Sequence, residues 1–247
     1  MYHSIDISGA NTWDRWHLVP SSRPVVAPPE VRTKYVDLPG THGYIDLTEL
    51  LIGGPAYGKR SGSWSFAAHP SYSDREPWNT KYQDIMQYLH GKQHKIILED
   101  DPFFYYEGRL TVSSWSSGKS YSTVNIGYNL KPFKKEIISS EEDWLWDPFC
   151  FENGIIRGYS NIAINGTKYF RIDTGEEKVK PTVSNTGSGT LTLIYRPNAD
   201  RNATWAFETI EPGESKSYVD FVLQGEKNYI YLTGTTTVTI SFRGGWL

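Results

Sequence analysis

The sequence predicts a mainly β protein, with an N-terminal β domain that carries one α-helix and an extended arm, followed by a C-terminal β-sandwich. Apolar residues mostly alternate with polar ones, which is the period of a half-buried strand. Residues 78–89 instead carry the 3.6-residue apolar period of a helix. In the second half, short apolar segments are separated by Gly, Asn and Pro about every ten residues, a spacing typical of sandwiches and jelly rolls.

The N-terminal domain begins with a short strand and an extended arm. Ile5 and Ile7 share one face of that strand. The four prolines within residues 20–29 then impose an extended path with few backbone donors. A strand follows, with Val31 and Tyr35 on the same side. Such a segment cannot form a core alone, so we expect the arm to lie along its own domain or along a neighbouring subunit.

The predicted helix is followed by the strands of the N-terminal domain. Its apolar stripe consists of Trp78, Tyr82, Ile85, Met86 and Leu89. Gly91 lies just past its end, where a left-handed residue is favoured. We expect a core strand over residues 95–98, a long strand over 103–112, a hairpin turn at 116–119 and a returning strand over 124–130.

Four consecutive aromatic residues open the long strand: Phe103, Phe104, Tyr105 and Tyr106. Neighbouring residues of a strand point to opposite faces, so both faces are aromatic here. The strand is either buried on both sides within its own domain, or covered by its own core on one face and by another subunit on the other. The residues leave both interpretations open.

The C-terminal domain, residues 134–247, begins with a charged and then aromatic connector at 134–152. Asn165-Gly166 is a strong signal for a two-residue type I′ hairpin. No helical pattern is present in this part of the sequence. We expect short strands over residues 162–164, 191–195, 217–223, 229–232 and 238–242.

Composition excludes several classes of protein. The formal net charge of −3 argues against an electrostatic nucleic-acid binder. Cys150 is the single cysteine, which excludes an internal disulfide and a cysteine zinc site, and it is more typical of a buried hydrophobe than of a nucleophile. The first residues lack the pattern of a signal peptide, and no apolar run approaches the length of a membrane span. We therefore expect a reducing compartment and no membrane partner.

Ionisable residues are concentrated between positions 90 and 102. His90 and His94 could ligate zinc on one helical face, but Gly91 lies between them and ends the helix. Three carboxylates follow: Glu99, Asp100 and Asp101. Adjacent residues on a turn do not provide the two separated carboxylates of a glycosidase. We expect no catalytic residue, no cofactor and no metal ligand, with a hydrolase as the minor alternative.

Several stretches resemble the distal tail proteins of long-tailed phages that infect Gram-positive bacteria. The resemblance is carried by residues 11–24, 88–92, 96–102, 105–109 and 238–245. It covers the first ~130 residues well, whereas the middle of the chain matches more by architecture than by motif.

This resemblance implies a structural protein rather than an enzyme. Residues 1–133 would form the tail-tube-like ring domain of a homohexamer that joins the tail tube to the tail tip or baseplate and surrounds the DNA channel. Residues 134–247 would form a galectin-like β-sandwich. The implied partners are further copies of the chain, the major tail tube protein, a tail-tip or tail-associated protein and a receptor-binding protein. DNA would pass without specific binding, and the protein would reach the virion tail tip after synthesis in the host cytoplasm.

We expect the subunit contacts to involve six residues of the N-terminal domain: Trp13, Trp16, Val31, Tyr35, Phe103 and Tyr105. The alternative function is a carbohydrate-binding module or adhesin that recognises a host cell-wall saccharide. It would use exposed aromatic residues of the C-terminal sandwich, such as Trp205, as stacking surfaces for sugar rings.

Overall fold

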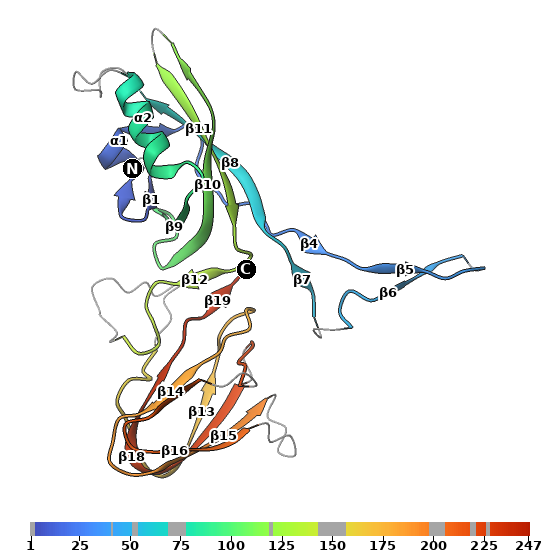
Figure 1. Ribbon diagram of the computed structural model, residues 1–247, viewed down its shortest axis with the longest axis vertical. Coiled ribbons are helices and arrows are strands. Elements are labelled where there is room, and N and C mark those ends of the chain that lie inside the picture. The colour runs from blue at the N-terminus through green and yellow to red at the C-terminus, as the bar shows by residue number, and fades with distance from the viewer. Residues whose placement is uncertain are drawn as a thin grey trace. The chain divides into compact units, whose positions relative to one another are not determined.

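The computed structural model divides the chain into two compact units, Met1–Lys134 (unit 1) and Lys135–Leu247 (unit 2). It describes residues 3–40, 42–50, 54–68, 78–118, 121–142, 157–197, 206–217, 221–225 and 228–247. Strands dominate both units, so the predicted mainly β fold is confirmed (Figure 1).

Unit 1 is built on an antiparallel sheet with the strand order β2-β1-β9-β10-β11-β8-β3. Its strands are β1 Ile5–Ile7, β2 Ala10–Asn11, β3 Leu18–Pro20, β8 Arg60–Ala68, β9 Gln93–Leu98, β10 Phe104–Ser117 and β11 Ser122–Leu130. The strands expected from alternation are therefore present, and several extend beyond the predicted bounds.

The predicted helix is α2, Trp78–Leu89, which lies beside the sheet of unit 1 (Figure 1). Its stripe buries Ile85 and Leu89 completely in the core of this unit. Gly91 follows the helix with φ of 74°, the left-handed conformation that glycine adopts without strain.

A second helix, α1 Thr12–Trp16, adds to the one that the sequence predicts. Its start is fixed by the side chain of Asn11, which accepts hydrogen bonds from the backbone N–H groups of Trp13 and Asp14. Five residues are too few for an apolar period, so only the capping residue signals this helix.

The long strand β10 buries one face in its own unit. Phe104 and Tyr106 are buried, and Leu110 and Val112 continue that face into the core. Phe103 and Tyr105, which the sequence places on the other face, are only partly buried. Within its own unit, the strand is thus fully covered on one side and incompletely covered on the other.

The arm consists of two short two-stranded ladders. The first joins β4 Val31–Arg32 to β7 Ala56–Tyr57, and the second joins β5 Tyr35–Asp37 to β6 Tyr44–Asp46. Neither ladder pairs with the main sheet of unit 1. Figure 1 shows the arm leaving the sheet at β4 and β7 and ending beyond β5 and β6.

Unit 2 is centred on one long strand, β18 Asn228–Ser241. Strand β13 pairs with it along one side, while β15 and then β14 pair along the other. The remaining bounds are β12 Lys134–Glu136, β13 Ile162–Ile172, β14 Thr182–Asn185, β15 Leu191–Pro197, β16 Ala206–Ile210, β17 Ser215–Ser217 and β19 Gly245–Trp246. Because β18 contributes to both parts of the sheet, its apolar residues help to enclose a single core in this unit.

The hairpin predicted at Asn165-Gly166 is wrong. Both residues lie inside β13, where Gly166 stands opposite Gly234 of β18. Both glycines have positive φ, 82° and 159°, so the two strands deform together and continue. The same deformation lets β18 run as one strand where the sequence suggested two. Glycine allows backbone conformations that other residues avoid. Here it permits a bend within a pair of strands rather than a turn.

Candidate functional site

The proline-rich segment that leads into the arm is held on its own unit by three side chains. Trp64 donates from Nε1 to the carbonyl oxygen of Val25 at 2.9 Å. Arg60 donates from Nη1 to the carbonyl oxygen of Ala27 at 3.0 Å, and the hydroxyl of Tyr128 accepts from the N–H of Ala27 at 3.0 Å. The first part of the arm therefore lies along its own domain, which is one of the two arrangements that the sequence leaves open.

Arg60 fixes the point where the arm leaves the main sheet of unit 1. Its side chain is almost completely buried, and its Nε donates to the carbonyl oxygen of Pro132 at 2.7 Å. Burial lowers the pKa of this guanidinium, and the nearby Tyr106 and Tyr128 oppose that effect. Two backbone segments far apart in the sequence are thus joined by one buried cation.

Beyond this point the arm is uncovered. Its exposed apolar side chains are 40 to 74% exposed, and they comprise Val31, Tyr35, Val36, Leu38, Tyr44, Ile45 and Leu50. Tyr35 and Tyr44 pack edge to face across the outer ladder, with ring centroids 4.7 Å apart. An isolated two-stranded hairpin is marginally stable in water, and a cluster of exposed apolar side chains indicates an interaction surface. The outer arm, residues 33–50, is therefore a candidate interaction surface.

The outer arm is also acidic. Between residues 33 and 50 it carries three carboxylates and one lysine, a net charge of 1 − 3 = −2, from Lys34, Asp37, Asp46 and Glu49. The hydroxyl and the backbone N–H of Thr48 hydrogen-bond to Asp46 and hold the pKa of its carboxyl group below the usual range. These side chains are exposed or nearly so, and their charge is available to a partner.

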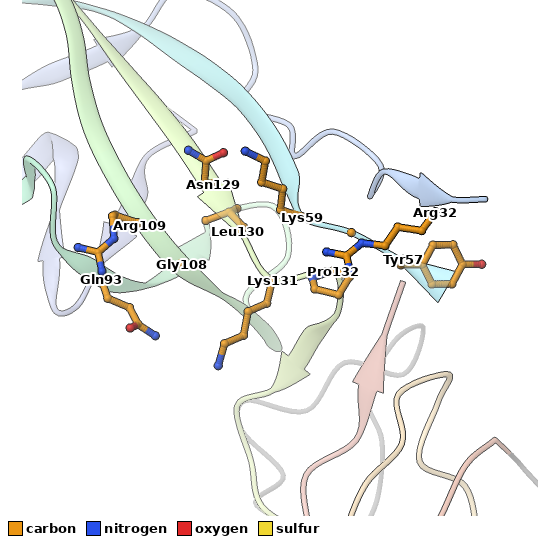
Figure 2. Close-up of a pocket in the computed structure, with 11 residues that line it drawn as sticks. Arg32, Tyr57, Lys59, Gln93, Gly108, Arg109, Asn129, Leu130, Lys131 and Pro132 are labelled. Carbon is orange, nitrogen blue, oxygen red and sulfur yellow. The ribbon is translucent and has the colours of Figure 1, made fainter. Parts of the chain in front are cut away.

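A basic pocket of about 450 Å³ lies at the base of the arm (Figure 2). It is lined by Arg32, Tyr57, Gly58, Lys59, Gln93, Gly108, Arg109, Asn129, Leu130, Lys131 and Pro132. Four of these side chains are cationic and none is a carboxylate. Lys131 is paired with Glu107 outside the lining, with Nζ and Oε2 at 2.5 Å, and Arg109 donates to the carbonyl oxygen of Gly91. Among the described residues, Arg32 and Lys59 form no ion pair.

The six predicted interface residues come from several separate elements of unit 1. Val31 and Tyr35 are exposed on the arm. Trp13 is partly buried on α1, where its ring lies 5.4 Å from that of His17. Tyr105 is partly buried on β10 under the ammonium group of Lys95, 4.2 Å from its ring. Phe103, two residues before Tyr105, is also partly buried.

Trp16 requires a correction. It is only 2% exposed, and its Nε1 donates to Asp84 Oδ2 at 2.6 Å. Burial opposes ionisation of Asp84, but the hydrogen bonds from Arg15 and Trp16 outweigh it and lower the pKa of this carboxyl group. Trp16 therefore belongs to the core of unit 1, and we leave it out of the proposed interface.

Two parts of this site are not among the residues predicted from the sequence. Tyr44 and Ile45 lie on β6, the return strand of the arm, and the Pro39-Gly40 pair before them is a sequence signal for the turn that precedes it. The four cations of the basic pocket come from separate segments that only the fold brings together.

The histidines between positions 90 and 102 serve the fold. His90 accepts a hydrogen bond at Nδ1 from the N–H of Val112 at 3.1 Å, and His94 Nδ1 lies 3.3 Å from Ser8 Oγ. Within the described residues, no group of three or more His, Cys, Asp or Glu residues is placed to hold a metal ion. Cys150 and Trp205 lie outside the described residues.

Each carboxylate of the following turn has a structural partner. Glu99 accepts from the N–H of Ser4 at 2.6 Å, and Asp101 pairs with Lys134 at 2.7 Å. Asp100 pairs with Arg23 at 2.7 Å, and the hydrogen bond from Arg23, aided by His3, lowers the pKa of its carboxyl group although burial opposes this. Each of the three carboxylates therefore has a partner within unit 1.

No helix in the described parts of the chain is both long and apolar enough to cross a membrane. No protein-family model and no curated protein sequence matches the chain.

The solved structures do provide matches. The chain is similar to the Dit protein of phage SPP1, described as a paradigm of the hub adsorption apparatus in phages that infect Gram-positive bacteria. The TM-score is 0.64 at 13% identity, and all of both chains is covered. It also matches a structure of the phage P2 baseplate in its activated conformation with Ca, at 11% identity over 91% of this chain and 88% of that one. That TM-score of 0.37 is too low to establish a common fold.

The match thus defines the chain as a β-rich protein of known fold. More particularly, the chain shares the fold of the SPP1 Dit protein over its whole length, and the resemblance seen in the sequence is confirmed at the level of fold.

Proposed function

We propose that the protein is a non-enzymatic structural component of a phage tail, located at the tail tip. It forms a hexameric ring that joins the tail tube to the tail tip or baseplate and surrounds the DNA channel. The observation that carries this proposal is the outer arm, whose apolar side chains are uncovered in the single chain. The fold shared with SPP1 Dit supports it, because that protein is described as part of an adsorption hub.

The two units have different roles in this proposal. Residues 1–133 form the ring, and residues 134–247 form a galectin-like domain that docks neighbouring tail proteins. The partners are further copies of the chain, the major tail tube protein, a tail-tip or tail-associated protein and a receptor-binding protein. DNA passes through the ring without specific binding, and the protein is made in the host cytoplasm before it enters the virion.

The subunit contact uses the arm first. Val31, Tyr35, Tyr44 and Ile45 provide its apolar part, since each is exposed in the single chain. Trp13, Phe103 and Tyr105 provide further contacts in unit 1, because each is only partly buried there. Aromatic side chains with incomplete cover are typical of the cores of subunit interfaces.

The assembly test uses the purified full-length chain. We expect six-fold rings in electron micrographs and a hexamer mass by light scattering, either alone or with the tail tube protein. Replacing Tyr44 and Ile45 by Ser removes two apolar contacts and reduces the assembled fraction. Tyr169→Ser is the matched control, because Tyr169 is equally exposed but lies on unit 2. A chain that stays monomeric with and without tube and tip proteins contradicts the proposal.

A second candidate function is saccharide binding by unit 2. Tyr169 is 66% exposed on β13, and its ring lies 6.2 Å from that of Tyr231 on β18. Exposed tyrosine rings can stack on sugar rings. This function predicts saturable binding to host cell-wall polysaccharide that Tyr169→Ala abolishes, and a glycan array without hits would exclude it.

A further inference from the structure

The base and the tip of the arm carry opposite charges. Arg32, Lys59, Arg109 and Lys131 surround the basic pocket at the base, and no carboxylate lines it. The outer arm carries Asp37, Asp46 and Glu49 against a single lysine. Both surfaces belong to unit 1. Within the described residues, neither surface faces enough opposite charge to balance its own net charge.

We propose that the acidic outer arm of one copy docks in the basic pocket of the next copy. This proposal rests on the proposed assembly and names the two surfaces that meet in it. Asp37 and Glu49 supply carboxylates to Arg32 and Lys59, which form no ion pair among the described residues of the single chain. The apolar side chains of the outer arm pack beside these charges and lose their exposure to water.

The pocket has the chemistry that this occupant requires. Arg32 comes from β4 and Tyr57 from β7, while Arg109 comes from β10 and Leu130 from the end of β11 (Figure 2). Cationic groups thus stand beside the apolar surfaces of Leu130, Pro132 and Tyr57. A segment with carboxylates next to tyrosine and isoleucine side chains fits such a mixed surface.

A chain cannot make this contact with itself without bending its arm back. The outer ladder β5–β6 lies beyond β4 and β7, whose residues line the pocket (Figure 1). The contact therefore joins two different patches on two copies, which is a heterologous contact. Contacts of this kind close into rings when the rotation between copies is suitable.

Charge reversal provides the sharpest test. Variant A carries Arg32→Glu and Lys59→Glu, so that two carboxylates replace the cations that would face the carboxylates of the arm. Variant B carries Asp37→Lys and Glu49→Lys, so that its arm is repelled by the unchanged pocket. We expect each variant alone to lose at least about tenfold in assembled fraction, because like charges then face each other. The readouts are mass photometry and electron microscopy.

An equimolar mixture of the two variants restores assembly. The acidic arm of variant A fits the basic pocket of variant B. The two lysines introduced into the arm of variant B meet the two carboxylates introduced into the pocket of variant A. Variants A and B must alternate around such a ring, which is possible only with an even number of subunits. Restored rings would therefore also agree with the proposed hexamer. A single chain that carries all four changes assembles as well.

The controls separate this inference from the proposed function. Lys168→Glu with Lys180→Glu changes the net charge as much as variant A does, but on unit 2, and should leave assembly unchanged. The neutral pair Arg32→Gln with Lys59→Gln is used if variant A does not fold, and we expect it to reduce assembly less.

If the unmodified chain assembles and variants A and B assemble equally well, the docking inference fails while the proposed function stands. If the unmodified chain forms no assembly with tube and tip proteins present, the proposed function itself fails.

Discussion

The guanidinium of Arg60 donates from Nη1 to the backbone carbonyl oxygen of Ala27, with 3.0 Å between the two atoms. The same side chain donates from Nε to the carbonyl oxygen of Pro132. A carbonyl of the segment that enters the arm and a carbonyl at the end of the unit are thereby tied to one buried group on β8. The arm is anchored at its base and uncovered at its tip, as expected of an element that binds a partner.

Replacing Arg60 by Met should destabilise unit 1. The change leaves the carbonyl oxygens of Ala27 and Pro132 without their donors, and hydrogen bonds from charged groups contribute about 1.5–3 kcal/mol each. We expect the free energy of unfolding in urea to fall by about 2–4 kcal/mol. Arg23→Met is the control, because the pair of Arg23 with Asp100 is largely exposed on the arginine side and should cost under about 1 kcal/mol. Equal losses in both variants would contradict this role for Arg60.

The sequence predicted those parts of the fold in which local pattern and burial agree. In β10 and β11 one face is buried in the same unit, so alternation of apolar residues reports the strand directly. The stripe of α2 predicts its helix for the same reason, since Ile85 and Leu89 are buried where the period places them.

Other parts depend on contacts that the sequence does not display. Trp16 appeared to be an interface residue because its partner, Asp84, lies far along the chain. Gly166 was assigned to a turn because its opposite residue, Gly234, is equally distant. The basic pocket combines five separated segments. In each case the deciding neighbour is remote in sequence, so a pattern of residue types alone is insufficient.

The facing glycines of unit 2 allow a matched comparison. A Cβ atom added to Gly234 would lie 2.5 Å from the carbonyl oxygen of Thr190, whereas one added to Gly166 would meet nothing within 4 Å. Both positions have positive φ, which costs an L-residue about 1–2 kcal/mol. We expect Gly166→Ala to lower the free energy of unfolding by about that amount, and Gly234→Ala by about 1–3 kcal/mol more because of the contact. Thermal unfolding would contradict this if Gly166→Ala were the more damaging change.

The ion pair of Glu136 and Arg157 lies inside unit 2. The two side chains are 6% and 5% exposed, and Oε1 of the glutamate lies 2.6 Å from Nη2 of the arginine. Trp246 also donates from Nε1 to this oxygen at 2.9 Å. Arg157→Met leaves a buried carboxylate without its cation, so we expect a loss of about 3–5 kcal/mol in the free energy of unfolding. Calorimetry of the variant measures this loss.

The control for this pair is the exposed pair of Lys131 and Glu107. Lys131→Met should cost under about 1 kcal/mol, since an exposed pair is screened by water. Adding Glu136→Leu to Arg157→Met removes the orphaned charge and should recover part of the loss. A double variant that is as unstable as the sum of both single changes would show that the charge is not the cause.

His94 should make unit 1 sensitive to mild acid. Burial lowers the pKa of its imidazole, the nearby Lys92 acts in the same direction, and the backbone at Tyr88 and Leu89 opposes this only in part. The ring also stacks on Tyr88, with centroids 5.5 Å apart. The neutral form is therefore the one that the folded state favours.

The sign of the pH effect follows from this shift. At a pH above the ordinary histidine value of about 6.5, the imidazole is neutral in both states and contributes no pH dependence. As the pH falls below that value, the unfolded chain binds a proton that the folded chain does not yet bind, so stability decreases. We expect His94→Gln to flatten the loss of stability between about pH 7 and pH 5. Losses at lower pH should remain in both proteins, because Asp84 and Asp100 keep their lowered pKa values. Urea unfolding across this range measures the difference, and parallel curves for the two proteins would show that His94 is not the responsible group.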